Sequence, residues 1–305
     1  MALWNSVAQA IAAATGRPFH VATLSPLNGG RVSSAYVLSD GATRYFVKTH
    51  VAGFARAYDW EARSLREIAA AGVPTPAVIA SGVRGTRSFL VLEYVEPARP
   101  PAPRSIAEAL IRLHGSTAPT FGADATGYVS LDRLHRPDNP TSALSGCEPL
   151  DNTPGTSWAD FWCERRLADR LSGCAASPAW DAARPRIEAL LPLIRAGLAA
   201  HRPAPALLHG DMNNQNWLSR PDGSLLFIDP ACWYGDPEVD LAALAGGAPA
   251  GREALAIYVH ESPRPAGFEW RLAVYTLWYL LSCWPVAAEP ILATTLDRIA
   301  RGPAD

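Results

Sequence analysis

Two aspartates and one asparagine in the second half of the chain are the residues whose types and spacing best suit chemistry. Asp211 stands in a His-x-Asp-x-x-x-x-Asn frame that ends at Asn216, and an apolar run with a Pro-Asp-Gly turn leads on to Asp229. A hairpin over this run would bring Asp229 back beside the other two side chains. Phosphoryl transfer needs such a group: one carboxylate accepts the proton of the acceptor hydroxyl, while an amide oxygen and a second carboxylate hold the Mg²⁺ that bridges the phosphates. Taken singly, Asp211 could be a turn residue, Asn216 a helix cap and Asp229 the start of a turn.

Lys48 is the only lysine of the chain, because 26 of the 27 lysine and arginine residues are arginine. It lies in a run of aromatic and β-branched residues that is typical of a strand. An ammonium is a compact charge on a slim stem and a guanidinium is a wide planar fork, so the two are not interchangeable in a tight phosphate site. Glu61, on a predicted helix, could pair with Lys48 and anchor it over the α- and β-phosphates. The plain alternatives are compositional drift for the lysine and a solvated surface position for the glutamate.

A pair of glycines, Gly29 and Gly30, lies in the loop between two predicted strands. A glycine pair alone is a weak signal and most often marks a turn. However, a glycine loop, a lysine on a strand, a glutamate on a helix, the Asp-x-x-x-x-Asn frame and a returning aspartate occur in the order that one phosphoryl-transfer mechanism requires. This order argues against coincidence.

The elements that must position these residues follow from the apolar periodicity. Over about the first 95 residues, a helix is expected at the N-terminus and another, closed by Gly72, over 54–71. The expected strands are 21–27, 35–38, 43–49, 78–81 and 88–95. A stiff proline-rich connector at 96–103 is the best boundary in the chain. We therefore predict two lobes, residues 1–96 and 97–305.

Beyond the connector the pattern becomes mainly helical. Residues 117–156 are rich in Gly, Pro, Asp and Ser and are predicted to be a loop, which at such a length often carries function. The apolar stretch 272–288 is shorter than the ~20 residues that a membrane span needs, and is predicted to be a buried helix. The other expected helices are 158–171, 179–200 and one with a shared face of Ile106, Leu110 and Leu113.

The composition excludes several classes of partner. With 49% hydrophobic and 18% charged residues, a net charge of −2 and a pI near 6.4, the chain is an ordinary globular one with no electrostatic reason to bind nucleic acid or an anionic membrane. The five cysteines form no Cys-x-x-Cys pair, and the N-terminus has no basic region typical of a signal peptide. We therefore expect free thiols and a cytoplasmic protein.

The chain resembles the protein-kinase-like phosphotransferases, and among them the fructosamine-3-kinase (ketosamine-3-kinase) family, along most of its length. The stretches that carry the resemblance are Gly29-Gly30 with Ser34-Ala35-Tyr36, Tyr45-Phe46-Val47-Lys48, Trp60-Glu61-Ala62, Phe89-Leu90-Val91-Leu92-Glu93, Leu208-His209-Gly210-Asp211, Phe227-Ile228-Asp229-Pro230-Ala231 and Tyr234-Gly235-Asp236-Pro237-Glu238-Val239-Asp240-Leu241-Ala242. The His-Gly-Asp frame is shared with aminoglycoside and choline kinases, whereas the last two stretches are more particular to ketosamine kinases. The resemblance implies an α+β, bilobal protein-kinase-like fold with a small antiparallel-sheet N-lobe and a larger, mainly helical C-lobe.

The resemblance also implies a role for each matching residue, with ATP and Mg²⁺ as cofactors. Asp211 would be the catalytic base, and Asn216 and Asp229 would bind Mg²⁺. Lys48, braced by Glu61, would contact the ATP phosphates. The implied nucleotide-site residues are further Gly29 and Gly30, which cover the triphosphate, and Glu93, Tyr94 and Val95, whose backbone meets adenine. Asp240 would brace the catalytic loop through backbone hydrogen bonds, and His209 would be structural.

Two departures from the family pattern bear on the acceptor and on control. The family usually reads His-Gly-Asp-Leu-Trp-x-Gly-Asn, but here Asn213 stands in place of the tryptophan near the sugar, and Trp217 is not an obvious replacement. The glycine loop also lacks the cysteine that some relatives use for redox-linked dimerisation, so we expect no such switch and favour a monomer. Gly210 occupies the place of the arginine that reads activation-loop phosphorylation in protein kinases, which favours a small-molecule kinase.

Three functions stay open. The first is an ATP-dependent kinase that phosphorylates a sugar hydroxyl of ketosamines, free or on glycated protein. The second is the same chemistry on another hydroxyl, such as that of an aminoglycoside or amino alcohol, although the dense acidic lining that an aminoglycoside calls for is not visible as an acidic run. The third is a pseudokinase that binds nucleotide without transfer, against which stands the presence of every expected catalytic group.

Overall fold

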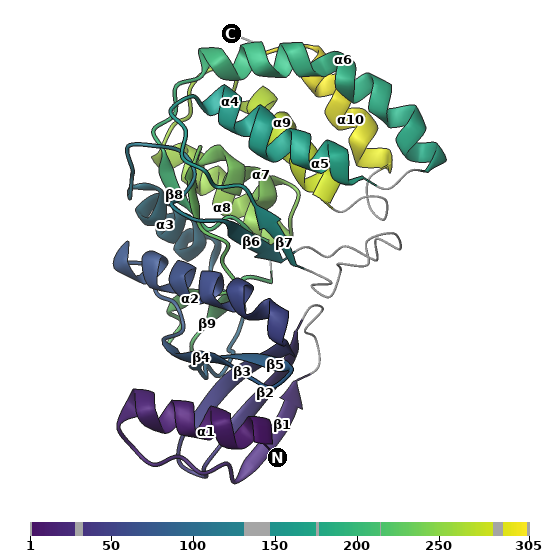
Figure 1. Ribbon diagram of the computed structural model, residues 1–305. Coiled ribbons are helices and arrows are strands. Elements are labelled where there is room, and N and C mark those ends of the chain that lie inside the picture. Colours follow the sequence, from purple (N-terminus) through teal and green to yellow (C-terminus); the bar gives the residue numbers. More distant parts are fainter. Residues whose placement is uncertain are drawn as a thin grey trace.

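The computed structural model describes residues 2–27, 33–130, 147–174, 177–213, 215–282 and 289–303. It has two lobes, with the N-terminus at the far end of the smaller one and the C-terminus at the far end of the larger one (Figure 1). The small lobe holds a five-stranded antiparallel sheet and the large lobe is mainly helical. The predicted α+β, bilobal fold is therefore confirmed.

The sheet of the small lobe has the strand order β1-β2-β3-β5-β4, and every neighbouring pair is antiparallel. Its strands are β1 (Thr23–Leu27), β2 (Ser34–Ser39), β3 (Arg44–Val51), β4 (Val78–Arg84) and β5 (Arg87–Glu93). Lys48 on β3 lies opposite Ala35 on β2 and Leu90 on β5. The lysine is thus on a central strand, where the backbone is held from both sides.

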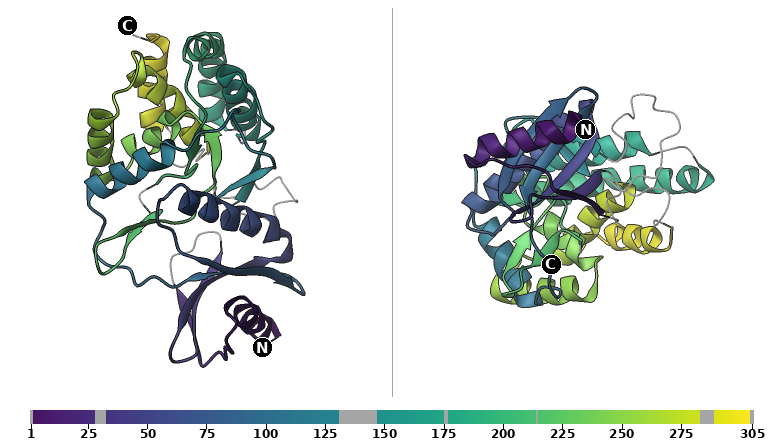
Figure 2. Two further views of the ribbon diagram at one scale, coloured as in Figure 1. Left: turned by 90° about the vertical axis from the view of Figure 1, so that its left-hand side faces the viewer. Right: turned by 90° about the horizontal axis from the view of Figure 1, so that it is seen from below.

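Two helices cover the two faces of this sheet, and Figure 2 shows α1 on the outer face and α2 between the sheet and the large lobe. Val47 and Val91 pack on α1 (Ala2–Thr15), whereas Leu90 and Leu92 pack on α2 (Ala55–Ala70). Because side chains alternate along a strand, Lys48 follows Val47 on the opposite face, towards α2. The sheet's own periodicity thus aims the lysine at the helix that carries Glu61.

Helix α2 belongs to the core of both lobes. Gly72, with φ +80°, ends the helix in the left-handed conformation that glycine favours. Ile68 and Val73 are buried in the large hydrophobic core of the C-terminal lobe, and Ser64 Oγ accepts a hydrogen bond from the Cys232 amide at 3.1 Å. These contacts fix the helix against the large lobe.

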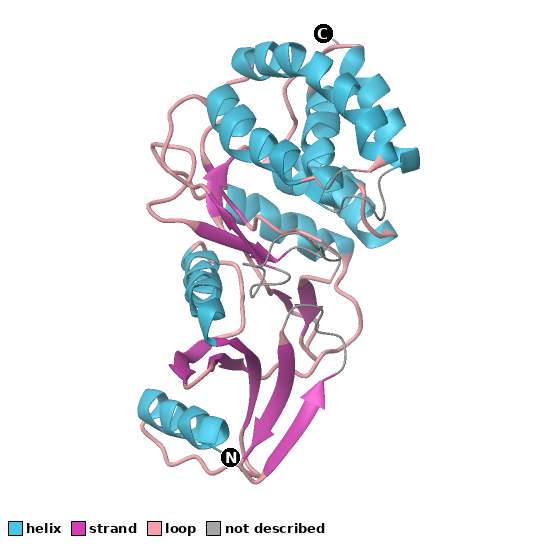
Figure 3. Cartoon of the chain, turned by 45° about the vertical axis from the view of Figure 1, so that its right-hand side comes forward, coloured by secondary structure: helices cyan, strands magenta, loops and turns pink. Residues whose placement is uncertain are grey.

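The large lobe is mainly helical (Figure 3). Its hydrophobic core includes the buried side chains of Trp158, Trp162, Trp233 and Trp278. Its helices are α3 (Pro103–His114), α4 (Trp158–Trp162), a π-helical segment (Cys163–Leu167), α5 (Ala168–Gly173), α6 (Pro178–Ala200), α7 (Glu238–Ala245), α8 (Pro249–Glu261), α9 (Phe268–Ser282) and α10 (Glu289–Ala300). Its strands form three short antiparallel pairs: β6 (Gly127–Ser130) with β7 (Cys147–Leu150), β8 (Ala206–Leu208) with β11 (Trp233–Gly235), and β9 (Trp217–Ser219) with β10 (Leu225–Phe227).

Two of the predicted elements differ in the structure. The prediction of a loop over 117–156 is wrong at β6 and β7, which pair although a long stretch of chain separates them. The helix predicted over 158–171 is interrupted by the π-helical segment, whose buried Arg166 donates from Nη1 to the carbonyl oxygens of Asp151 at 2.7 Å and Arg165 at 3.3 Å. The described cysteines, Cys163, Cys174 and Cys232, are free thiols, as expected. Among the described helices, none has the length and apolar character to cross a membrane.

Candidate active site

The catalytic loop leaves β8 at His209 and turns sharply at Gly210. Gly210 has φ +80°, and a Cβ at this position would lie 2.2 Å from the carbonyl oxygen of Ala231, so only glycine fits. The buried carboxylate of Asp240 on α7 accepts hydrogen bonds from the amides of His209 at 2.7 Å and Gly210 at 3.0 Å. The predicted bracing of the loop by Asp240 is confirmed.

His209 is structural, as predicted. Its Nε2 lies 3.0 Å from the carbonyl oxygen of Ile228, and its Nδ1 accepts a hydrogen bond from the Asp211 amide at 3.3 Å. These partners require a proton on Nε2 and none on Nδ1. Burial lowers the pKa of His209, which keeps the ring neutral. The ring thus ties the catalytic loop to the chain segment just before Asp229.

Asp211 and Asn216 lie together at the two ends of this loop. The Asn216 side chain, 5% exposed, donates from Nδ2 to the backbone oxygen of Asp211 at 2.7 Å and to its Oδ2 at 3.1 Å. Burial raises the pKa of Asp211 to about 7, although the hydrogen bonds from Asn213 and Asn216 oppose this shift. A carboxylate whose pKa lies near neutrality is suited to accept a proton.

Asp229 reaches the same place from the β9–β10 hairpin. The hairpin turns at Gly223, with φ +86°, and the Ile228 amide then donates to the Asn216 backbone oxygen at 3.0 Å. Asp229 is the only non-glycine residue with positive φ (+54°) in the part of the chain that the structure describes. A residue before proline disfavours helical conformations, so this backbone is strained, and such strain gathers at functional sites.

Lys48 joins the two lobes at this point. Its Nζ lies 2.8 Å from Oε1 of Glu61 and 2.7 Å from Oδ1 of Asp229. Burial by itself would lower the pKa of the ammonium, but the two carboxylates outweigh burial and raise it, so Lys48 stays protonated. Burial raises the pKa of Glu61 to about 7, with Lys48 opposing. The predicted Lys48–Glu61 pair therefore forms, and the lysine also holds Asp229.

The segment that links the lobes is fixed by the Glu93 side chain. Its Oε1 accepts a hydrogen bond from Nη1 of Arg220 at 2.8 Å, and its Oε2 accepts one from the Ala77 amide at 3.1 Å. The Arg220 hydrogen bond is the main cause that lowers the pKa of Glu93. The Arg44 guanidinium lies 4.4 Å from the Tyr94 ring centroid, and Val95 is buried. Glu93, Tyr94 and Val95 thus belong to the segment that links the lobes. The contact of their backbone with adenine stays a prediction.

One predicted pair of residues cannot be placed, the expectation for Trp217 agrees with the structure, and one polar contact was not predicted. Gly29 and Gly30 lie outside the described residues. Trp217 is buried in the core near Gly251 of α8, so it offers no aromatic platform to an acceptor. The unpredicted contact is that of Asn213, whose Nδ2 donates to Oδ1 of Asp211 at 3.2 Å. Its place inside the catalytic loop was the available signal.

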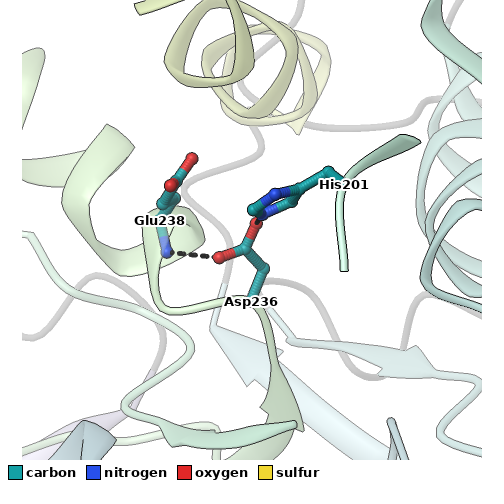
Figure 4. Close-up of side chains that lie close together, drawn as sticks. All are labelled: His201, Asp236 and Glu238. Carbon is teal, nitrogen blue, oxygen red and sulfur yellow. Dashed lines mark hydrogen bonds and ion pairs between the residues drawn. The ribbon is translucent and has the colours of Figure 1, made fainter. Parts of the chain in front are cut away.

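A second group of acidic side chains, Asp236 and Glu238 with His201, lies deep in the large lobe (Figure 4). Their ligand atoms lie within 4.8 Å of one another, which would suit a metal. However, Glu238 makes a two-pronged ion pair with Arg271, at 2.7 and 2.9 Å, and a third contact with Arg264 at 3.2 Å. Because two guanidinium groups already neutralise these carboxylates, a cation would meet repulsion there, and the cluster is structural.

Several known proteins resemble this chain in sequence and in fold. A sequence profile of the family described as fructosamine kinase matches residues 3–288. A probable ketoamine kinase of Synechocystis sp. is 32% identical over 282 residues, which cover 92% of this chain and 90% of the relative. The crystal structure of a fructosamine-3-kinase candidate from Thermobifida fusca is 28% identical, with a TM-score of 0.75 over 98% of this chain and 99% of that one. An aminoglycoside phosphotransferase in a ternary complex with ADP and hygromycin B shares the fold, with a TM-score of 0.63 at 16% identity over 97% of both chains.

Proposed function

The chain belongs to the fructosamine kinase family, and from this premise we propose that it transfers the γ-phosphoryl group of ATP to a sugar hydroxyl of ketosamines, free or on glycated protein. The observation that carries this proposal is the Lys48 ammonium, which bridges Glu61 of the small lobe and Asp229 of the large lobe. Asp211 lies in the same cluster, since Asp229 is among the charges that raise its pKa. The side chains of Lys48, Glu61, Asp211, Asn216 and Asp229, to which we assign the transfer, thus lie together where the lobes meet.

Each residue of the cluster has a part in the proposed transfer. Asp211 accepts the proton of the acceptor hydroxyl. The hydroxyl oxygen forms a bond to the γ-phosphorus of ATP, while the bond between that phosphorus and the bridging oxygen of ADP breaks. Lys48 holds the α- and β-phosphates and offsets the charge that develops on the leaving ADP. Little covalent work falls to the protein, so rate acceleration comes mainly from positioning and charge.

The nucleotide would lie between a lobe of residues 1–96 and one of residues 97–305. The Glu93 amide already donates to the Ala77 oxygen at 2.8 Å, so an adenine donor would have to come from Tyr94 or Val95. The loop around Gly29 and Gly30 would cover the triphosphate. The aminoglycoside phosphotransferase with bound ADP has the same fold, which supports nucleotide binding by this chain.

The side chains that would hold Mg²⁺ are Asn216 and Asp229. The Asn216 NH₂ group is engaged by Asp211, which leaves its carbonyl oxygen as the ligand atom. The Asp229 carboxylate is 39% exposed, with one oxygen on Lys48. Carboxylate and amide oxygens are the hard ligands that Mg²⁺ prefers, so the residues fit the ion. When bound, the ion would neutralise charge on the β- and γ-phosphates.

A different hydroxyl acceptor is the second candidate, because Asn213 stands where the family pattern has a tryptophan near the sugar. The acceptor would then be held by hydrogen bonds rather than by an aromatic face. A cytoplasmic location and a monomeric state stay predictions.

Two experiments test the proposal. A coupled ADP-release assay across fructosamines, ribulosamines, aminoglycosides and amino alcohols should show turnover with ketosamines above all; turnover with another class alone would replace the acceptor, and turnover with none would remove the transfer itself. Separately, an ATP-derived acyl phosphate should label Lys48, and excess ATP with Mg²⁺ should protect it. Because Lys48 is the only lysine, one peptide of a digest reports this site and separates it from label on the N-terminal amine.

A further inference from the structure

Asn213 is the side chain whose two ends are both engaged beside the proposed base. Its Nδ2 donates to Oδ1 of Asp211 at 3.2 Å, and its Oδ1 accepts a hydrogen bond from the Gln215 amide at 2.9 Å. A backbone N–H needs an acceptor and a carboxylate needs a donor, so these partners settle which end of the amide is nitrogen. The loop backbone thereby holds the Asn213 amide with its NH₂ group facing Asp211.

The Asp211 carboxylate is consequently held from both sides. Asn213 donates to Oδ1, and Asn216 donates to Oδ2 at 3.1 Å. Rotation of the carboxylate about its Cβ–Cγ bond would weaken both bonds together. A carboxylate offers about four acceptor positions, so two bonds leave room for the hydroxyl of an acceptor. The pair of amides therefore fixes an orientation without blocking the base.

We propose that Asn213 is a positioning residue, whose amide holds the Asp211 carboxylate in line with the acceptor hydroxyl. This inference rests on the proposed phosphoryl transfer. Orientation of a reacting group is worth large rate factors only when the geometry is fixed beforehand. Asn216 would also serve the metal, so Asn213 is the partner of Asp211 that acts on orientation alone. Its effect lies in kcat rather than in the binding of ATP.

The first test compares variants at one position with a control in the same loop. Asn213→Ala should lower kcat about 10- to 100-fold, with KM for ATP changed less than about two-fold. Asn213→Asp has the same shape but lacks the NH₂ donor and adds a like charge, so its kcat should fall at least as far. Gln215→Ala keeps the backbone amide that Asn213 uses and should behave as the wild type. A raised KM for the acceptor with unchanged kcat in Asn213→Ala would mean that Asn213 contacts the acceptor, and would overturn the proposal.

The second test asks whether Asn213 acts through Asp211. In the Asp211→Asn background, Asn213→Ala should cause no further loss of kcat, because the carboxylate that it orients is gone. Losses that simply multiply would show an independent role and would overturn the proposal.

An arm without catalysis separates this inference from the proposed function. The wild type, Asn213→Ala, Asp211→Asn and the double variant are unfolded in denaturant. The shifts in the unfolding midpoint should be clearly non-additive, since the two side chains share a hydrogen bond. If no acceptor is phosphorylated, the proposed function fails whatever the midpoints are. If transfer occurs but the midpoints add, the contact between Asn213 and Asp211 is absent and this inference alone fails.

Discussion

Two acidic clusters within the described residues differ in how their charge is neutralised. In the buried cluster, Asp236 accepts hydrogen bonds from Tyr275 at 2.6 Å, from His201 at 2.8 Å and from the Glu238 amide at 3.1 Å, and both acids are fully buried. In the cluster between the lobes, the carboxylates of Asp211 and Asp229 are partly exposed. In the buried cluster, protein donors and guanidinium groups neutralise the carboxylates. In the cluster between the lobes, some carboxylate oxygens stay accessible to a ligand.

The pKa shifts of the two clusters differ in direction, and this separates a structural acid from a candidate functional one. Burial drives the pKa of Asp236 up, but the hydrogen bond and charge of His201 with the other donors more than reverse this, so the pKa of Asp236 is lowered. For Asp211, burial outweighs the hydrogen bonds from Asn213 and Asn216, so its pKa is raised to about 7. Incomplete pairing, rather than the count of acids, therefore distinguishes the proposed active cluster from the structural one.

The largest expected effect comes from making the same substitution in each cluster. Asp211→Asn should lower kcat for transfer about 10²- to 10⁴-fold, because it removes the proton acceptor. Asp236→Asn should keep kcat within a few-fold and instead lower the midpoint of thermal unfolding, because a buried amide cannot satisfy all three donors. Initial rates of ADP release and thermal melts of both variants check this. The same loss of kcat in both would erase the distinction between the clusters.

Next in size is the effect of breaking the buried ion pair. Arg271→Ala leaves the fully buried Glu238 with only the weaker contact to Arg264, so the free energy of unfolding should fall by about 3–5 kcal/mol. Arg298→Ala removes an exposed pair with Glu269 and should cost less than about 0.5 kcal/mol. Denaturant titrations of the two variants decide the point, and equal midpoints would show that the buried network contributes no more than a surface contact.

A smaller effect should follow from Lys48→Arg, which keeps the positive charge between the two lobes but changes the shape of the group that carries it. The guanidinium cannot occupy the compact place between Glu61 and Asp229, where both carboxylates lie within 2.8 Å of the ammonium. Loss of a well-placed charge-assisted hydrogen bond corresponds to a fall of about 10- to 100-fold in kcat/KM for ATP. Steady-state kinetics with varied ATP measure it; wild-type values would remove the special role of the single lysine.

The last of these effects is a dependence of stability on pH, whose direction should differ between the two clusters. Because the pKa of Asp211 is raised to about 7 in the folded protein, the folded state keeps a proton that the unfolded state loses near its ordinary pKa of 3.8. Stability from this group is therefore fully present below about pH 4 and is lost as the pH rises through about 7. Without Mg²⁺, the stability of Asp211→Asn should therefore rise relative to that of the wild type as the pH rises from about 4 to 7.

The matched control for this pH experiment is Asp236→Asn. The pKa of Asp236 is lowered, so its contribution is present above its ordinary pKa and is lost as the pH falls, and the variant should lose ground relative to the wild type as the pH rises from acid. In melts between about pH 2 and 8, Asp211→Asn should gain on the wild type between about pH 4 and 7, whereas Asp236→Asn should lose ground as the pH rises to about 5 and stay level above it. Parallel slopes would contradict the opposite pKa shifts on which the comparison depends.

The sequence was enough to predict that Lys48 pairs with Glu61, because the strand with the lysine precedes the helix with the glutamate as the phosphoryl-transfer mechanism requires, and the structure shows how the pair is aligned. Alternation along β3 turns Lys48 towards α2, and the Pro-Asp-Gly turn before β10 brings Asp229 back to Asn216. The helices and strands of the small lobe, and α3, α6 and α9 of the large lobe, follow from similar local patterns, whereas α7, α8 and α10 were not predicted. The predicted features depend on neighbours in the sequence, so a single chain is sufficient to predict them.

The partners of the buried acids could not be predicted in this way. Glu238 finds Arg271 on another helix, and Asp236 finds His201 and Tyr275 from two further elements. Such pairs are set by packing between helices, which no local pattern encodes. The same holds for β6 and β7, which pair across a long connection, and for the positive φ of Asp229, which the surroundings impose.

The measurement that tests the account most directly is ³¹P NMR of a mixture of ATP, Mg²⁺ and a small fructosamine with three proteins: the wild type, Asp211→Asn and Asp236→Asn. We predict that a phosphate monoester signal grows as the γ-phosphate signal of ATP declines in the wild type and in Asp236→Asn, and stays absent over the same time in Asp211→Asn. Growth of the monoester at the wild-type rate in Asp211→Asn would contradict the assignment of the partly exposed cluster as the site of transfer.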